Sequence, residues 1–315
     1  MFSGLIALHI PDGFITPSVA GLGWLMCVLV IWMATRQTRT QFGEAQVPVM
    51  GVLAAFIFAA QAINFPIMAG TSGHLVGAAL AGIVMGPWAG SLIMAAVVIV
   101  QGLIFQDGGL LVMGWNVINM VAAVLVGSSA YLVIFRILGT DRKRSRPLAA
   151  MIAAWISVEI GAVATALELA VSGTFPLGLS LPAMTLIYGI VGVCEGVITA
   201  AAISLLQVSR PEVLRGGEES QGKISAAWLS SGMALALVIA LFSPLASGAP
   251  DGLEVVAHQL GASESEPFLS IFPDYSVSFI SSSVYSTIVA MVIGVIMVFS
   301  SVLAVGHLVA RRSEE

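Results

Sequence analysis

The chain has 315 residues, of which 58% are hydrophobic and 9% are charged, and its mean hydropathy is +1.01. Soluble domains carry about 25% charged residues, so the composition predicts an all-α, polytopic protein of the cell membrane, surrounded by lipid. The net charge of −5 gives no reason to expect nucleic acid as a partner. Two cysteines, Cys27 and Cys194, are too few for a disulfide framework or a cysteine-rich metal site.

The first eight residues are apolar but lack a basic segment, so they are a poor signal peptide. About nine apolar spans follow, as a group of seven and a group of two. Their approximate ranges are 18–35, 47–68, 74–86, 89–106, 114–138, 148–172, 182–207, 225–246 and 282–308. The third is too short to cross a bilayer alone, and we expect a broken or tilted helix that its neighbours shelter.

Basic residues predict how these spans are oriented. They follow the first, fifth, seventh and last spans, as Arg36, Arg39, Arg142, Lys143, Arg144, Arg146, Arg210, Arg215, Lys223, Arg311 and Arg312. Loops rich in Lys and Arg lie in the cytoplasm. Nine spans place all of these basic residues in the cytoplasm if the N-terminus is outside and the C-terminus is cytoplasmic. His9, the stretch 64–74, the stretch 106–109 and the loop 248–280 then all lie on the outer side.

Residues 209–224 are polar and rich in glycine, which is typical of a linker. We expect this linker to lie in the cytoplasm between two units of the chain. The first unit comprises residues 1–208 with seven spans. The second comprises residues 225–315 with two spans and the outer loop 248–280.

Two histidines are the leading candidates for chemistry. Imidazole is a common protein ligand for Ni, Co, Cu and Zn. His74 follows a turn between two apolar segments, and His9 lies near the start of the chain. A structural role is the alternative for each, because a histidine at a helix end often bonds a carbonyl and tails carry histidines freely. We interpret His258 and His307 as structural.

Other polar residues have less certain interpretations than the histidines. Asp107 precedes two glycines, which is typical of a turn. Asn116 and Asn119 are one helical turn apart, and either orient an imidazole or form hydrogen bonds between helices. Three carboxylates within apolar spans need a partner or a neutral state, and the sequence assigns no role to them: Glu159, Glu168 and Glu195.

Several motifs together resemble a known family. In order they are HIPDGF at 9–14, NFP at 64–66, GTSGH at 70–74, GPWAG at 86–90 and QDGG at 106–109. They resemble the CbiM/NikM family over about residues 8–208. Members are the substrate-capturing membrane components of energy-coupling-factor transporters for cobalt and nickel. The PDGLE sequence at 250–254 resembles the PDGLE domain, a small NikN-type accessory component, so the chain resembles a fusion of the two.

The resemblance implies a metal site. The family uses a histidine at the second position of the mature chain, which corresponds to His9, and the histidine of the GTSGH motif, which corresponds to His74. The terminal amine, the backbone nitrogen and imidazole of His9, and the imidazole of His74 would supply four nitrogens in one plane. This geometry suits Ni(II), Cu(II) or low-spin Co(II), whereas Zn(II) prefers a tetrahedron. The expected surrounding residues are Asn64, Thr71, Ser72, Asp107, Asn116 and Asn119.

One feature departs from the family pattern. Seven residues precede Leu8, so the terminal amine is not adjacent to His9 in the sequence as written. We hypothesise that the functional chain begins at position 8, read from a leucine-type start codon, which would make the amine of residue 8 the donor. Proteolytic trimming and a rearranged site are the alternatives.

The resemblance implies a transport component rather than an enzyme, with Ni²⁺ or Co²⁺ as the transported substrate and no organic cofactor. The sequence contains no phosphate-binding P-loop, so the implied partners are a transmembrane coupling protein and two cytoplasmic ATPase subunits. The resemblance of the PDGLE segment to the nickel-associated accessory component mildly favours nickel over cobalt as the substrate. A membrane metalloenzyme, an ATP-independent secondary transporter and a metal-binding sensor or assembly protein are the alternatives.

Overall fold

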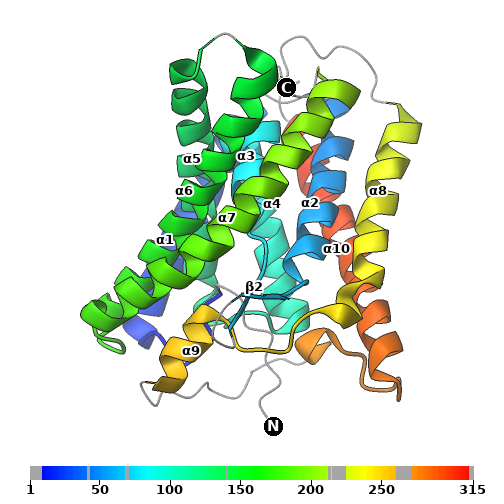
Figure 1. Ribbon diagram of the computed structural model, residues 1–315. Coiled ribbons are helices and arrows are strands. Elements are labelled where there is room, and N and C mark those ends of the chain that lie inside the picture. The colour runs from blue at the N-terminus through cyan, green and yellow to red at the C-terminus, as the bar shows by residue number, and fades with distance from the viewer. Residues whose placement is uncertain are drawn as a thin grey trace.

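The computed structural model describes residues 9–40, 43–67, 71–139, 141–211, 214, 225–259 and 271–311. It is a bundle of long helices with a short β-hairpin at one end (Figure 1). The elements are α1 (Pro17–Arg39), α2 (Val47–Gln61), β1 (Phe65–Pro66), β2 (Ser72–Gly73), α3 (Ala78–Met85), α4 (Pro87–Val100), α5 (Met113–Ile137), α6 (Arg142–Val171), α7 (Leu177–Ser209), α8 (Ala226–Leu241), α9 (Gly252–Gln259) and α10 (Ser283–Arg311). A π-helical turn, η2 (Gln101–Phe105), extends α4, and single 3-10 turns lie at Glu44–Gln46, Ser243–Leu245 and Pro273–Tyr275.

Apolar side chains cover the outside of the bundle as well as its interior. Within the described residues, eight helical segments are long and apolar enough to cross a membrane. On α1, for example, Leu25 is 70% exposed and Trp32 is 56% exposed. Such a surface suits a lipid environment, because the exposure of so much hydrocarbon to water is energetically unfavourable. The prediction of an all-α, multi-pass membrane protein is confirmed.

The third predicted span, 74–86, is only partly helical in the structure. Only α3 is helical there, and it has eight residues. Gly77 before it and Gly86 after it have φ angles of +74° and +81°, a conformation that glycine adopts without strain. In Figure 1 the hairpin lies at the lower end and α3 in the upper half, so an extended stretch and α3 together return the chain through the bundle. α3 is buried against α4, α5 and α6, as the sequence predicted.

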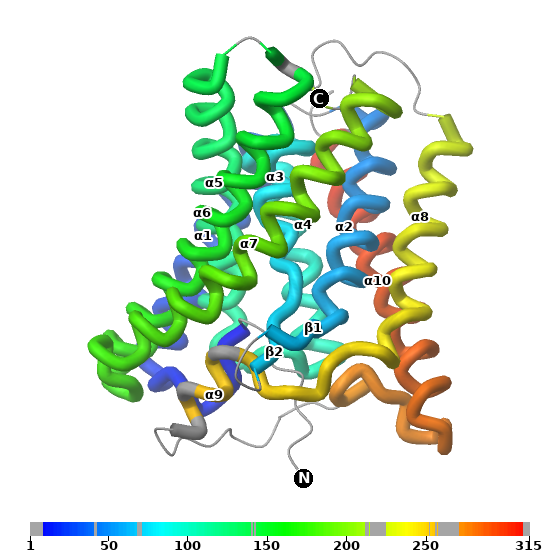
Figure 2. Tube along the Cα trace, in the orientation of Figure 1, coloured from blue at the N-terminus to red at the C-terminus, as the bar shows by residue number. Residues whose placement is uncertain are grey.

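The basic ends of the helices gather at one end of the bundle. The C-terminal ends of α1, α7 and α10 lie at the upper end in the tube view, together with the α5–α6 connection (Figure 2). The β-hairpin and α9 lie at the opposite end. Which end faces the cytoplasm stays a prediction. Arg215, Lys223 and Arg312, most of the predicted linker and residues 260–270 of the predicted outer loop lie outside the described residues.

The last two long helices pack directly on the first unit. α2 contacts both α8 and α10, and α10 also contacts α4. Small residues allow this close approach. A side chain added at Gly294 of α10 would collide with Phe58 of α2 and Phe105 of η2. The C-terminal unit therefore packs as one body with α2 and α4 of the first unit.

The carboxylate of Glu195 on α7 fixes the chain just before α3. Its two oxygens accept hydrogen bonds from the backbone amides of Val76 and Gly77, at 2.8 and 2.7 Å. Replacement by alanine would leave two buried donors unpaired, each at a cost of about 1–3 kcal/mol. We expect Glu195→Ala to lower the thermal unfolding temperature in detergent by several degrees. The matched control is Glu159→Ala, at a half-buried position on α6, and equal shifts for the two variants would contradict this role.

Candidate metal centre

His9 and His74 lie side by side although 65 positions separate them in the sequence. Both side chains are fully buried. Their ring centroids are 6.2 Å apart, with 36° between the ring planes. Two imidazoles that share one metal ion, each with a bond of about 2.0–2.1 Å, have centroids separated by at most about 6.4 Å, when the two bonds are in line. The observed separation is therefore close to that of a bridged pair.

The two histidines have the same pattern of ring contacts. Nδ1 of His9 lies 3.0 Å from Oδ1 of Asp107, and Nδ1 of His74 donates to the carbonyl of Leu75 at 2.7 Å. Nε2 of each ring is buried without a hydrogen-bond partner. A hydrogen bond at one ring nitrogen sets the tautomer that leaves a lone pair on the other. The arrangement thus presents two buried nitrogen donors, and buried polar atoms without partners are rare in folded proteins.

The segment that carries His9 is held by side chains from the α4–α5 region. Asn116 of α5 accepts from the amide of Ile10 at 2.8 Å and donates to the carbonyl of Ile10 at 3.1 Å. The carboxylate of Asp12 accepts from the amides of Leu110 and Leu111. Gly108 has a φ angle of +98°, and a side chain there would collide with Cβ of His9. These contacts explain why a glycine follows Asp107.

His74 is positioned by the hairpin before it and the break in helix after it. β1 and β2 pair antiparallel, with Phe65 opposite Gly73. Beyond His74, the side chain of Gln61 donates to the carbonyl of Val76 at 2.6 Å. Together with the two bonds of Glu195, this bond gives the buried backbone at Val76 and Gly77 the partners that a helix would otherwise supply.

Asp107 connects the histidine pair to the C-terminal unit. Its Oδ1 faces His9, and its Oδ2 accepts from the hydroxyl of Tyr275 at 2.6 Å. The backbone reaches this position through the π-helical turn and through Gln106, which has a φ angle of +60°. π-helical turns and left-handed residues of this kind cluster at functional sites.

Burial and charge act in opposite directions on the groups of this cluster. Burial, and to a lesser extent the neighbouring His9, lowers the pKa of His74 to about 4. Burial alone would raise the pKa of Asp107, but the charge and hydrogen bond of His9 and the hydroxyl of Tyr275 bring it below its usual value. Burial and the adjacent carboxylate raise the pKa of Tyr275. At neutral pH the cluster therefore presents a neutral imidazole, a carboxylate and a phenol.

The other predicted site residues have different surroundings. The amide of Ser72 donates to the carbonyl of Pro250, and its hydroxyl to that of Ala249. The carbonyl of Asn64 accepts from the amide of Ser247, and the carbonyl of Thr71 accepts within the hairpin.

The two asparagines of α5 have separate roles. Asn116 binds the backbone of the segment that carries His9, whereas Asn119 binds Glu168 and Thr165 of α6. Asn119 thus makes the hydrogen bonds between helices that were one of its two predicted roles.

The sequence did not single out Tyr275, Tyr188, Gln61 or Asp12. Tyr188 of α7 donates to Oδ2 of Asp251 at 3.0 Å. Asp251 also begins α9 with a reciprocal pair of bonds, in which Asp251 and Glu254 each accept from the other's amide. Burial raises the pKa of Asp251 to about 8. The spacing of Asp251 and Glu254 matches the pattern of a helix start, a signal from which the role of Asp251 could have been predicted.

Leu8 and the preceding residues lie outside the described residues, as does the side chain of His258. His307 is exposed on α10, and its Nδ1 bonds the carbonyl of Leu303 one turn earlier. In the part of the chain that the structure describes, no three His, Cys, Asp or Glu side chains converge in a metal-binding group.

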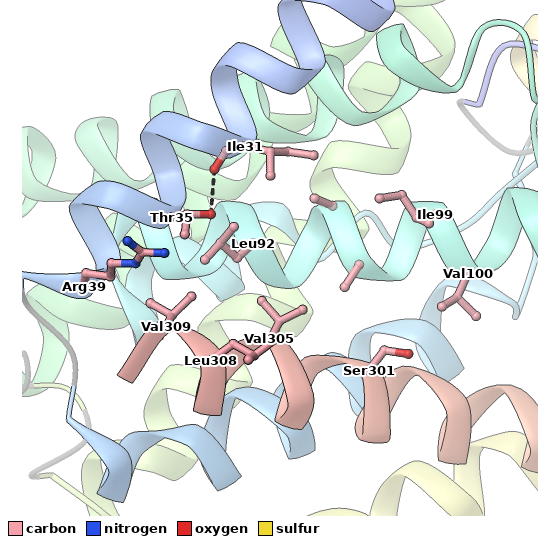
Figure 3. A pocket seen from close by; sticks show the side chains of 12 residues that line it. Ile31, Thr35, Arg39, Leu92, Ile99, Val100, Ser301, Val305, Leu308 and Val309 are labelled. Atoms are coloured by element: carbon pink, nitrogen blue, oxygen red, sulfur yellow. Dashed lines mark hydrogen bonds between the residues drawn. The ribbon is translucent and has the colours of Figure 1, made fainter. Parts of the chain in front are cut away.

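A cavity of about 480 Å³ lies elsewhere, between α1, α4 and α10 (Figure 3). Its walls are mainly aliphatic, with Arg39 at one end. Thr35 of α1, which also lines the cavity, donates to the carbonyl of Ile31. No imidazole, thiol or carboxylate lines the cavity, so it offers no set of donors for a metal ion.

The fold and the site define a class: a polytopic helical membrane protein with a buried pair of imidazoles. The chain belongs to the CbiM family, described as the cobalt uptake substrate-specific transmembrane region, whose profile matches residues 9–213. A PDGLE domain matches residues 226–311. Both resemblances predicted from the motifs are confirmed, and the chain belongs to a family of transport proteins, not of enzymes.

Individual relatives agree with this assignment. A protein of Archaeoglobus fulgidus, named as a fused nickel transport protein NikMN, is 36% identical over 93% of this chain and 96% of its own length. The cobalt transport protein CbiM of Kyrpidia tusciae is 28% identical over 65% of this chain and 86% of its own. A crystal structure described as a transition metal transporter has a TM-score of 0.59 and 28% identity, over 68% of this chain and all of that one.

The role of Asn116 can be tested against Asn119, its neighbour on the same helix. We expect Asn116→Leu to release the backbone of Ile10, whose buried amide then has no partner. Hydrogen exchange measured by mass spectrometry should become faster in peptides that cover residues 9–14. Asn119→Leu should leave that segment protected, and equal acceleration in both variants would refute the assignment.

Proposed function

We propose that the chain captures Ni²⁺ or Co²⁺ at His9 and His74 and is the substrate-binding component of an energy-coupling-factor transporter. The observation that carries the proposal is the pair of buried Nε2 atoms without partners, in rings 6.2 Å apart. Imidazole nitrogens bind these ions well. Membership of the CbiM family and the nickel and cobalt transport names of the relatives support the same substrates.

Asp107 complements the charge of the ion. A buried divalent cation needs nearby negative charge, and the Asp107 carboxylate lies against His9. A carboxylate that bonds the second nitrogen of a ligating histidine also fixes the ring and raises its basicity. Ligation through Nε2 of both histidines uses the ring orientations that the structure shows.

The planar four-nitrogen scheme makes a further demand on His9. A chelate that includes the backbone nitrogen of His9 must use Nδ1, because Nε2 lies on the far side of the ring. In the structure Nδ1 faces Asp107, so this scheme requires the ring to turn. It also requires an amine at residue 8, and we propose it as the alternative to ligation through Nε2 of both histidines.

Capture alone would not move the ion, and the sequence has no P-loop for ATP. We therefore propose that a transmembrane coupling protein and two cytoplasmic ATPase subunits drive release of the ion on the inner side. The β-hairpin that precedes His74 lies at the end of the bundle opposite the basic helix ends, which supports capture from outside. The C-terminal unit, placed against the histidine pair, would assist loading.

The alternative of an ATP-independent transporter needs carboxylates along a path through the membrane. Glu195 instead binds backbone amides beside His74, and Glu168 binds Asn119. These contacts favour structural roles for both. Metal uptake that persists without ATPase partners would favour the secondary transporter, and binding without any uptake in their presence would favour a sensor.

Removal of a ligand tests the site directly. We expect His74→Ala to weaken Ni²⁺ binding by more than about 100-fold, which exceeds the usual loss from changing an outer partner of a ligand. His307→Ala, an exposed histidine of α10, is the matched control and should bind as the wild type does. Isothermal titration calorimetry in detergent measures the Ni²⁺ affinity of both variants. Unchanged affinity in His74→Ala would refute the proposed site.

The pH dependence of binding distinguishes the possible donors. The pKa of His74 is about 4, so protons compete for this imidazole mainly near and below pH 4. A terminal amine ordinarily has a pKa of about 7.7–8.0, so it is already mostly protonated at neutral pH and protons compete strongly for it below pH 8. With the four-nitrogen site, we expect the Ni²⁺ affinity to be markedly lower at pH 5 than at pH 8. Equal affinities at these two pH values would count against amine ligation.

A further inference from the structure

Tyr275 is a residue of the C-terminal unit that reaches the histidine pair. Its hydroxyl donates to Oδ2 of Asp107 at 2.6 Å, and Oδ1 of the same carboxylate bonds His9 at 3.0 Å. The three side chains come from widely separated parts of the chain and are all buried. This continuous chain of hydrogen bonds joins the PDGLE domain to a candidate metal ligand.

We propose that Tyr275 is a positioning residue for metal capture, which orients His9 through Asp107, so that the C-terminal unit completes the metal site. The inference rests on the proposed function. It assigns to the PDGLE domain a direct part in the geometry of the site.

The first support is that both oxygens of Asp107 are engaged. Oδ1 contacts His9 and Oδ2 accepts from Tyr275, so the plane of the carboxylate is fixed from both sides. Loss of the hydroxyl would leave Oδ2 buried without this donor and the carboxylate free to turn away from His9. Outer partners of a ligating histidine typically contribute 10–100-fold to metal affinity.

The second support is that the fold holds Tyr275 in place against a conformational cost. Asp274 and Tyr275 have φ angles of +50° and +53°, which residues with side chains rarely adopt. The ring of Tyr275 stacks on Phe105, with centroids 4.8 Å apart and 12° between planes, and also contacts Phe58. Gln101 donates to its hydroxyl at 3.3 Å. Such strain persists only where surrounding contacts enforce it, and it clusters at functional sites.

The third support is that the same unit also forms hydrogen bonds with the segment before His74. The carbonyl of Pro250 accepts from the amide of Ser72, two positions before His74, at 2.8 Å. The amide of Ser247 donates to Asn64 at the start of the hairpin. The hydroxyl of Tyr188 donates to Asp251, which fixes the end of this loop before α9. The C-terminal unit therefore makes two separate sets of hydrogen bonds. One reaches the carboxylate that contacts His9, and the other reaches the hairpin that precedes His74.

The test is the substitution Tyr275→Phe, which removes the hydroxyl and keeps the ring that packs on Phe105. We expect Ni²⁺ affinity to fall about tenfold, the lower end of the range for outer partners, and the visible absorption spectrum of bound Ni²⁺ to shift as the His9 ring reorients. Tyr285→Phe, at a position on α10 that is 67% exposed, is the matched control. It should match the wild type in affinity and spectrum.

A double-mutant cycle separates positioning from general damage. If Tyr275 acts through Asp107, then Asp107→Asn with Tyr275→Phe should bind Ni²⁺ no more weakly than Asp107→Asn alone. Losses that simply multiply would overturn the inference, as would wild-type affinity and an unshifted spectrum in Tyr275→Phe. If the wild-type chain itself binds neither Ni²⁺ nor Co²⁺, the proposed function fails instead, so the two failures are distinguishable.

Discussion

The buried contact between His9 and Asp107 is the interaction on which the rest of the site depends. A carboxylate and an imidazole in a low-dielectric interior need each other and further hydrogen bonds, because unpaired they would be costly to bury. Asp107 finds those partners in His9 and Tyr275. The pair thereby ties three parts of the chain to one point: the N-terminal segment, the end of the α4 helix and the C-terminal unit.

The surrounding structure supplies what this contact requires. The backbone near both histidines is irregular, and at membrane depth each of its polar groups needs a partner from the protein. Asn116 supplies partners for Ile10, and Glu195 and Gln61 supply them for the extended stretch after His74. Because both imidazoles are fully buried, an ion reaches them only when covering segments separate. The hairpin and the loop before α9 are joined by hydrogen bonds at Ser72, two positions before His74.

Much of this arrangement could be predicted from the sequence, and the reasons are physical. Hydropathy located the long helices, and the positions of basic residues placed His9 and His74 at one end of the bundle before any contact was known. Asn119 and Asp251 have local contexts, a helix interior and a helix start, that narrow their roles. Tyr275 had no such signal, since its partner Asp107 lies 168 positions away and no local pattern encodes a long-range hydrogen bond. The roles of Glu195 and Gln61 were hidden for the same reason.

The central claim is that one transition-metal ion binds both imidazoles, and X-ray absorption spectroscopy of the Ni²⁺-loaded protein tests it most directly. The account predicts nitrogen ligands at about 2 Å with the multiple-scattering signature of two imidazole rings, and loss of one ring in His74→Ala. A spectrum with no imidazole scattering, or one that is unchanged in His74→Ala, would contradict it.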